Sequence, residues 1–85
     1  MPVLYSPGVE RRLYSLPRVI YDEFQAAFDA LEKNPSDPGP PYRTKRLGGS
    51  SGDWVVRWKN LGAIYRFEGG SIIVKKVDYR SRLYG

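Results

Sequence analysis

The sequence predicts an α+β domain in which a short first strand and two helices precede an antiparallel meander of three to four strands. Apolar residues recur at helical spacing before residue 34 and alternate with a period of two after residue 53. The proline-rich segment "NPSDPGPP" at 34–41 separates these patterns. The 85 residues suffice for one core, so we expect a single domain over 1–85. Both helices should cover one face of the sheet and leave the other partly open.

The elements of the first half follow from short apolar patterns. An apolar run at 3–5 predicts a brief strand that ends at "SPG". Val9, Leu13 and Leu16 recur at i, i+4 and i+7, which predicts a short helix that ends at Pro17. A second helix begins at Arg18. Its apolar stripe consists of Ile20, Phe24, Ala27, Phe28 and Leu31. Both stripes are typical of faces that pack on a core.

Three strands of the predicted meander of three to four can be located in the second half. Apolar residues alternate with polar or smaller ones over 54–59 and again over 63–67. The segment "SIIVKKV" at 71–77 follows a Gly69-Gly70 pair that favours a turn. We expect the tandem Lys75 and Lys76 to point to opposite faces of this last strand.

Composition excludes several classes of site. The chain has neither Cys nor His, which removes thiolate chemistry, zinc sites and a His general base, and we expect no metal and no cofactor. Fourteen Lys and Arg against nine Asp and Glu give a net charge of +5, which favours a polyanionic partner such as nucleic acid. No apolar run approaches a membrane span and the N-terminus is unlike a secretory signal. We therefore expect a cytoplasmic protein that does not bind membranes.

Three segments carry a resemblance to a known family. They are "RLGGSSGDWVVRW" at 46–58, "GAIYRF" at 62–67 and "VDYRSRLYG" at 77–85. In this order and spacing they resemble the RelE/ParE toxin superfamily, whose members are small basic proteins encoded with an antitoxin. The resemblance covers essentially the whole chain. It implies a type II toxin–antitoxin toxin with a cognate antitoxin as partner.

The resemblance also implies a site. In the ribosome-dependent ribonuclease branch, the enzyme cleaves messenger RNA on the ribosome by metal-independent attack of a 2′-hydroxyl on its neighbouring phosphate. The residues of this chain that match the family's catalytic positions are Arg57, Arg80 and Tyr84. The expected RNA-binding residues are Lys59, on the same strand face as Arg57, together with Arg66, Lys76, Tyr79 and Arg82. Arginine suits this task because its planar guanidinium binds phosphate through two charge-assisted hydrogen bonds.

The chain departs from the family pattern at two cationic positions. An Arg typical of the third strand falls on Gly62, and a basic position of the second strand falls on Val55. Losing one charge-stabilising donor can lower a rate about 100- to 1,000-fold. Restoring the cation with Gly62→Arg is expected to raise the rate if the strand tolerates the side chain.

Three functions therefore stay open at this point. The first is the messenger RNA endoribonuclease, for which Asp78 and Glu68 are the nearest candidates for a carboxylate base. The second is a ParE-like toxin that inhibits DNA gyrase by binding, which the absent cations favour. The third is a binding module with the toxin fold and weakened catalysis.

Overall fold

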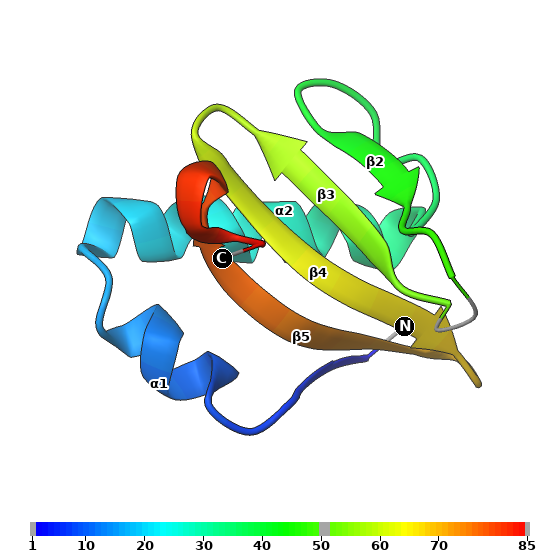
Figure 1. The fold of residues 1–85 in the computed structure, drawn as a ribbon, viewed down its shortest axis with the longest axis horizontal. Coiled ribbons are helices and arrows are strands. Elements are labelled where there is room, and N and C mark those ends of the chain that lie inside the picture. The colour runs from blue at the N-terminus through cyan, green and yellow to red at the C-terminus, as the bar shows by residue number, and fades with distance from the viewer. Residues whose placement is uncertain (1, 50–51, 85) are drawn as a thin grey trace.

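The computed structural model describes residues 2–49 and 52–84 (Figure 1). The elements are β1 (Val3–Tyr5), α1 (Val9–Tyr14), α2 (Arg18–Lys33), β2 (Arg43–Arg46), β3 (Trp54–Trp58), β4 (Leu61–Glu68) and β5 (Ser71–Tyr79). A 3-10 turn, η1 (Arg80–Arg82), follows β5 directly. The predicted α+β class and the order of strand, two helices and meander are confirmed.

The five strands form one sheet in the order β1-β5-β4-β3-β2. Strands β2 to β5 are antiparallel neighbours, while β1 pairs in parallel with β5. The alternation of apolar residues did not predict β2, because its sequence "RTKR" is entirely polar. A short, basic strand is a suitable edge, since its charges discourage pairing with other chains.

An irregularity in β5 corrects the expectation for the tandem lysines. Ile64 pairs with Lys76, but the next residue of β4, Tyr65, pairs with Val74, so β5 contains one extra residue. Val74 and Val77 both belong to the core that faces the helices. The bulge therefore places Lys75 and Lys76 together on the side of β5 away from that core, and the prediction of opposite faces is wrong.

The core lies between the sheet and the two helices. In Figure 1, α2 crosses behind the sheet and α1 lies beside β5. Phe24 of α2 is fully buried and meets the Trp58 ring edge-on, with 5.2 Å between ring centroids. The Trp58 indole Nε1 donates to the Glu23 carboxylate at 3.0 Å, so its polar atom is satisfied at the core margin. Neither α1 nor α2 has the length and apolar character needed to span a bilayer.

The opposite face of the sheet carries a second, smaller buried site. Val55 and Leu83 are both fully buried, yet neither belongs to the core beneath the helices. Leu83 follows η1, which lies in front of β4 on the face away from α2 (Figure 1). One short segment of the chain thus covers part of an otherwise open face.

The main core should dominate stability. We expect Phe24→Ala to lower the free energy of unfolding by about 3–5 kcal/mol, because it leaves a cavity among fully buried neighbours. Val19→Ala on the same helix is the matched control, since Val19 is 67% exposed and its truncation should change stability by less than about 0.5 kcal/mol. Urea denaturation followed by circular dichroism measures both, and equal effects would contradict this assignment of the core.

Candidate functional site

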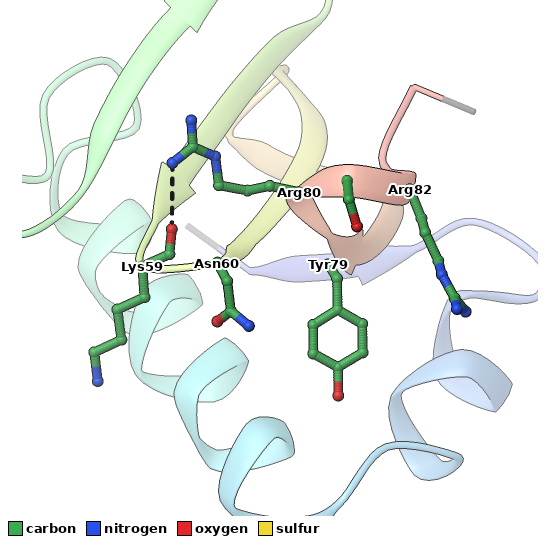
Figure 2. A pocket seen from close by; sticks show the side chains of 6 residues that line it. Lys59, Asn60, Tyr79, Arg80 and Arg82 are labelled. Carbon is green, nitrogen blue, oxygen red and sulfur yellow. Dashed lines mark hydrogen bonds between the residues drawn. The ribbon is translucent and has the colours of Figure 1, made fainter.

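A cavity of about 510 Å³ lies where the β3–β4 turn meets η1. We call it the first cavity. Its lining residues are Lys59, Asn60, Tyr79, Arg80, Ser81 and Arg82. Figure 2 shows that these side chains diverge: Arg80 reaches across toward the β3–β4 turn, whereas Tyr79 and Arg82 point toward the helices.

Two hydrogen bonds hold η1 against the β3–β4 turn. The Arg80 amide donates to the Asn60 carbonyl at 2.8 Å. The Arg80 guanidinium donates through Nη1 to the Lys59 carbonyl at 3.3 Å (Figure 2). Among residues 2–49 and 52–84, the guanidinium uses one of its five N–H groups, which leaves the others available to a ligand.

A second cavity, of about 180 Å³, adjoins the first and shares Lys59 and Arg80 with it. Its other lining residues are Pro41, Arg43, Arg57 and Trp58. Arg43 on β2 and Arg57 on β3 are direct partners across the strand pair. Three arginines from three separate elements therefore line one small cavity. We call the two cavities together the Arg80 site.

The charges of the three arginines, Arg43, Arg57 and Arg80, are not neutralised by carboxylates of the described residues. Like charges that lie directly opposite on neighbouring strands destabilise a sheet, as Arg43 and Arg57 must do here. Within residues 2–49 and 52–84, no carboxylate lies at ion-pair distance from either of them or from Arg80. Such an arrangement is stabilised when an anion enters it.

Lys59 lies at the Arg80 site but not as expected. Strand β3 ends at Trp58, and Lys59 adopts a left-handed backbone conformation with φ 51° in the turn. Its ammonium therefore reaches Glu23 on α2 at 2.7 Å instead of sharing the face of Arg57. The hydrogen bond from Lys59, assisted by that from Trp58, lowers the pKa of the Glu23 carboxyl. The Lys59 carbonyl, not its ammonium, contacts Arg80.

The other predicted residues divide into two groups. Arg57, Arg80, Tyr79 and Arg82 line the Arg80 site. Tyr84, which is 60% exposed, lines neither of its two cavities.

Arg66 and Lys76 lie elsewhere. The Arg66 guanidinium pairs with Asp53 at 3.3 Å, four residues along β4 from Gly62, which is about 13 Å along a strand. Lys76 lines a different cavity of about 320 Å³ beside the start of α1. Neither side chain therefore stands in for the cation that is absent at Gly62.

Sequence reasoning missed Arg43 as a member of the site. No apolar alternation marks β2, so neither the strand nor its register with β3 was predicted. The available signal was the basic run "RTKR" after the proline-rich loop, because a charged run of this kind is typical of an edge strand.

The two candidate carboxylate bases are not placed for that role. Glu68 is exposed at the end of β4 that pairs with Ser71, whereas the Arg80 site lies at the Leu61 end of the same hairpin. Asp78 accepts hydrogen bonds from Arg12 and from the Tyr79 amide, both at 2.8 Å. Burial raises the pKa of Asp78. These hydrogen bonds and the charge of Arg12 lower it by more than burial raises it, so the pKa lies below its ordinary value. Asp78 is thus held as a carboxylate by a partner of its own.

Comparison with solved structures identifies the fold. The chain superimposes on a chain of the archaeal RelE–RelB complex from Pyrococcus horikoshii with a TM-score of 0.77 and 26% identity, covering 95% of this chain and 96% of that one. The fold is RelE-like. A chain of the RelB–RelE antitoxin–toxin complex from Methanococcus jannaschii gives a TM-score of 0.72 at 18% identity, over 95% and 94%. A chain of the RelBE2 toxin–antitoxin complex from Mycobacterium tuberculosis gives 0.64 at 22%, over 93% and 96%.

The RelE-like fold confirms the resemblance drawn from the sequence. Neither protein-family models nor curated proteins yield a match to this sequence. The relationship is therefore expressed in the arrangement of elements, which agrees over nearly the whole of each chain, more than in residue identity.

The space beside Gly62, where the resemblance implies an arginine, is already occupied by neighbouring atoms. A Cβ atom at this position would lie 2.7 Å from the Leu83 Cδ2 atom and 3.3 Å from the Val56 carbonyl oxygen. The first approach requires the Leu83 side chain to shift, and the second is tighter than most real Cβ contacts. An arginine at 62 would therefore displace Leu83 and the turn it follows. Because the new side chain would displace Leu83, we now expect Gly62→Arg to lower the rate and not to raise it.

The Asp78–Arg12 pair provides a test of the electrostatics beside the site. We expect Asp78→Asn to lower the free energy of unfolding at pH 7 by about 1.5 kcal/mol, the lower end for a hydrogen bond to a charged group, because Arg12 is partly exposed. A lowered folded-state pKa contributes stability above the ordinary value of 3.8 and loses it as the pH falls through the folded-state pKa. The gap between variant and wild type should therefore close in acid.

Urea denaturation at pH 7 and along an acid series measures this gap. Asp22→Asn is the control, since its pair with Arg18 is exposed on α2 and should change stability by less than about 0.5 kcal/mol. A gap that persists unchanged in acid would show that Asp78 does not act through its charge.

Proposed function

We propose that this protein is a RelE-like toxin of a toxin–antitoxin pair that cleaves messenger RNA on the ribosome by 2′-hydroxyl attack. One observation carries the proposal: Arg43, Arg57 and Arg80 line a single cavity, and in the described residues none of the three has a carboxylate partner. Phosphate is the ligand that best matches such a cluster, because guanidinium groups bind its oxygens through paired, charge-assisted hydrogen bonds.

The arginines would supply the charge stabilisation that the reaction needs. Attack of a 2′-hydroxyl on the neighbouring phosphate builds negative charge on the phosphorane oxygens, and preorganised cations lower that barrier. Arg57 is half-buried on β3, and Arg80 is fixed through its backbone and side chain to the β3–β4 turn. Arg80 is therefore held before substrate arrives. Arg43, exposed on the edge strand, is suited to a flanking phosphate.

The two tyrosines would have different roles. The Tyr79 ring is half-buried and packs on the main core, so only its exposed part would be able to contact a bound nucleotide. Tyr84 is exposed and follows the anchored Leu83, so its ring is free to stack on a base and its hydroxyl to donate or accept a proton. Tyr84 is accordingly the better candidate for contact with the reacting nucleotide.

A second candidate function is inhibition of DNA gyrase by binding, as in ParE-like toxins. The observation that favours it is the apolar character of positions 55 and 62. Val55 is fully buried and Gly62 lies under Leu83, so neither position supplies a cation to the site. For the ribonuclease, the same observation predicts weak cleavage.

We also propose a cognate antitoxin as the partner. The three solved structures compared above are toxin–antitoxin complexes. The face of the sheet away from the helices in this chain carries basic side chains, among them Arg43, Arg57 and Arg66. An acidic, amphipathic segment that folds on binding would complement this face, and such segments typically bury about 1,000–3,000 Å².

Arg80→Ala tests the ribonuclease directly. We expect it to reduce cleavage of messenger RNA on programmed ribosomes at least about 100-fold, because a methyl group replaces a preorganised cation. Arg11→Ala is the control, since Arg11 is exposed on α1 away from the Arg80 site, and it should cleave like wild type. A gyrase supercoiling assay with the same proteins separates the two candidates. Wild type that blocks gyrase and cuts no RNA would establish the second function.

The antitoxin proposal has a separate test. Co-expression with the adjacent small reading frame should give a stable complex on size-exclusion chromatography, and the complex should lose affinity as salt rises because basic residues contribute to it. If the purified partners do not associate at micromolar concentration, the toxin–antitoxin assignment fails whatever the activity of the isolated chain.

A further inference from the structure

Leu83 is buried in an unusual place. Its side chain is 0% exposed, yet it lies outside the core beneath the helices, on the face of the sheet that is otherwise open. Its neighbours in sequence, Arg82 and Tyr84, are both exposed. A single apolar side chain therefore anchors a segment whose other side chains face solvent.

The seat for Leu83 is created by a glycine. Gly62 lies in β4 between Arg57 of β3 and Asp78 of β5, and it has no side chain of its own to fill the space above the strand. The Leu83 Cδ2 atom fills that space so closely that a Cβ at Gly62 would be 2.7 Å away. The Arg57 Cγ atom would lie 3.6 Å from the same Cβ, so Arg57 borders the seat.

We propose that Leu83 is a positioning residue whose insertion over Gly62 sets the place of η1 and thereby of Arg80 and Tyr84. The proposal rests on the function proposed above for the Arg80 site. The turn is only three residues long, and within the described part of the chain it makes one backbone–backbone hydrogen bond to another segment, from the Arg80 amide to the Asn60 carbonyl. The Leu83 amide bonds back to the Arg80 carbonyl at 3.3 Å, which couples the anchor to the arginine.

The same contact accounts for the departure from the family pattern at Gly62. A cationic side chain at 62 would occupy the space that Leu83 fills, and Val55 is a buried apolar residue on the same face of the sheet. The chain therefore has an apolar seat for its C-terminal turn where the family carries cations. Arg57, at the border of that seat, and Arg80, next to the anchor, are the cations that this arrangement retains.

Amide hydrogen exchange on the free protein tests the anchor without any RNA. We expect Leu83→Ala to speed exchange of the Arg80 amide at least about tenfold while the amides of β4 change little, because only the turn is released. Val74→Ala is the control, since Val74 is fully buried in the main core and its truncation should not single out Arg80. Exchange at Arg80 that is unchanged in Leu83→Ala would overturn the proposal.

Changing the side-chain sizes at positions 62 and 83, separately and together, gives a second test. Gly62→Ala should also release the turn, since its methyl group meets Leu83. The double variant Gly62→Ala with Leu83→Ala should exchange at Arg80 more slowly than the two single effects combined predict, because the smaller side chain makes room for the methyl. Strictly additive effects would mean that the two side chains do not share one space, which contradicts the proposal.

Binding of a short single-stranded RNA then separates positioning from the proposed function. If wild type binds the RNA, Leu83→Ala should raise the Kd about tenfold, and an unchanged Kd with a released turn would overturn the positioning role. If wild type does not bind RNA, on or off the ribosome, the proposed function fails. The anchoring of Arg80 by Leu83 is then decided by the exchange measurements alone.

Discussion

The helices cover one face of the sheet, and this constraint decides where the charges of the molecule gather. Phe24, Trp58 and Tyr65 pack in the core between the helices and the sheet. The other face of the sheet can therefore carry charged side chains. Two acidic residues beside this face are engaged: Asp53 binds Arg66 and Lys75, and Asp78 binds Arg12. In the described residues, Arg43, Arg57 and Arg80 have no carboxylate partner, and they lie together at the β2 and η1 end of this face. The Arg80 site thus gathers cations that the neighbouring carboxylates do not neutralise.

The C-terminal turn converts that surface into a cavity. Without η1, Arg57 and Arg43 would lie on an open strand face, where water screens their charge. The turn adds Arg80 to the cavity that Arg43 and Arg57 line, and cations that line a cavity raise the local field that a phosphate would meet. Because Leu83 provides the buried contact that holds the turn, a residue with no polar atoms in its side chain governs the electrostatics of the site.

The periodicity of apolar residues predicted the elements whose side chains pack on the main core. Helical spacing located α2, and alternation located β3, β4 and most of β5, because those side chains pack on one core. Features set by long-range pairing were missed: β2 lacks apolar residues, and the extra residue in β5 appears only once Ile64 and Tyr65 have found their partners. The resemblance placed Arg57 and Arg80 near one another, but Arg43 and the seat of Leu83 on Gly62 depend on register and on a turn that no periodicity marks.

The central claim is that an RNA phosphate binds among Arg43, Arg57 and Arg80. Side-chain NMR of arginine Nε–H groups, during titration with a short 2′-deoxy-blocked RNA that cannot be cleaved, tests it most directly. The account predicts that the signals of Arg57 and Arg80 shift together and saturate at the same RNA concentration, while that of Arg66, which is engaged with Asp53, stays in place. Shifts that appear at Arg66 and not at Arg57 or Arg80 would contradict it and move the RNA-binding surface to the other end of the sheet.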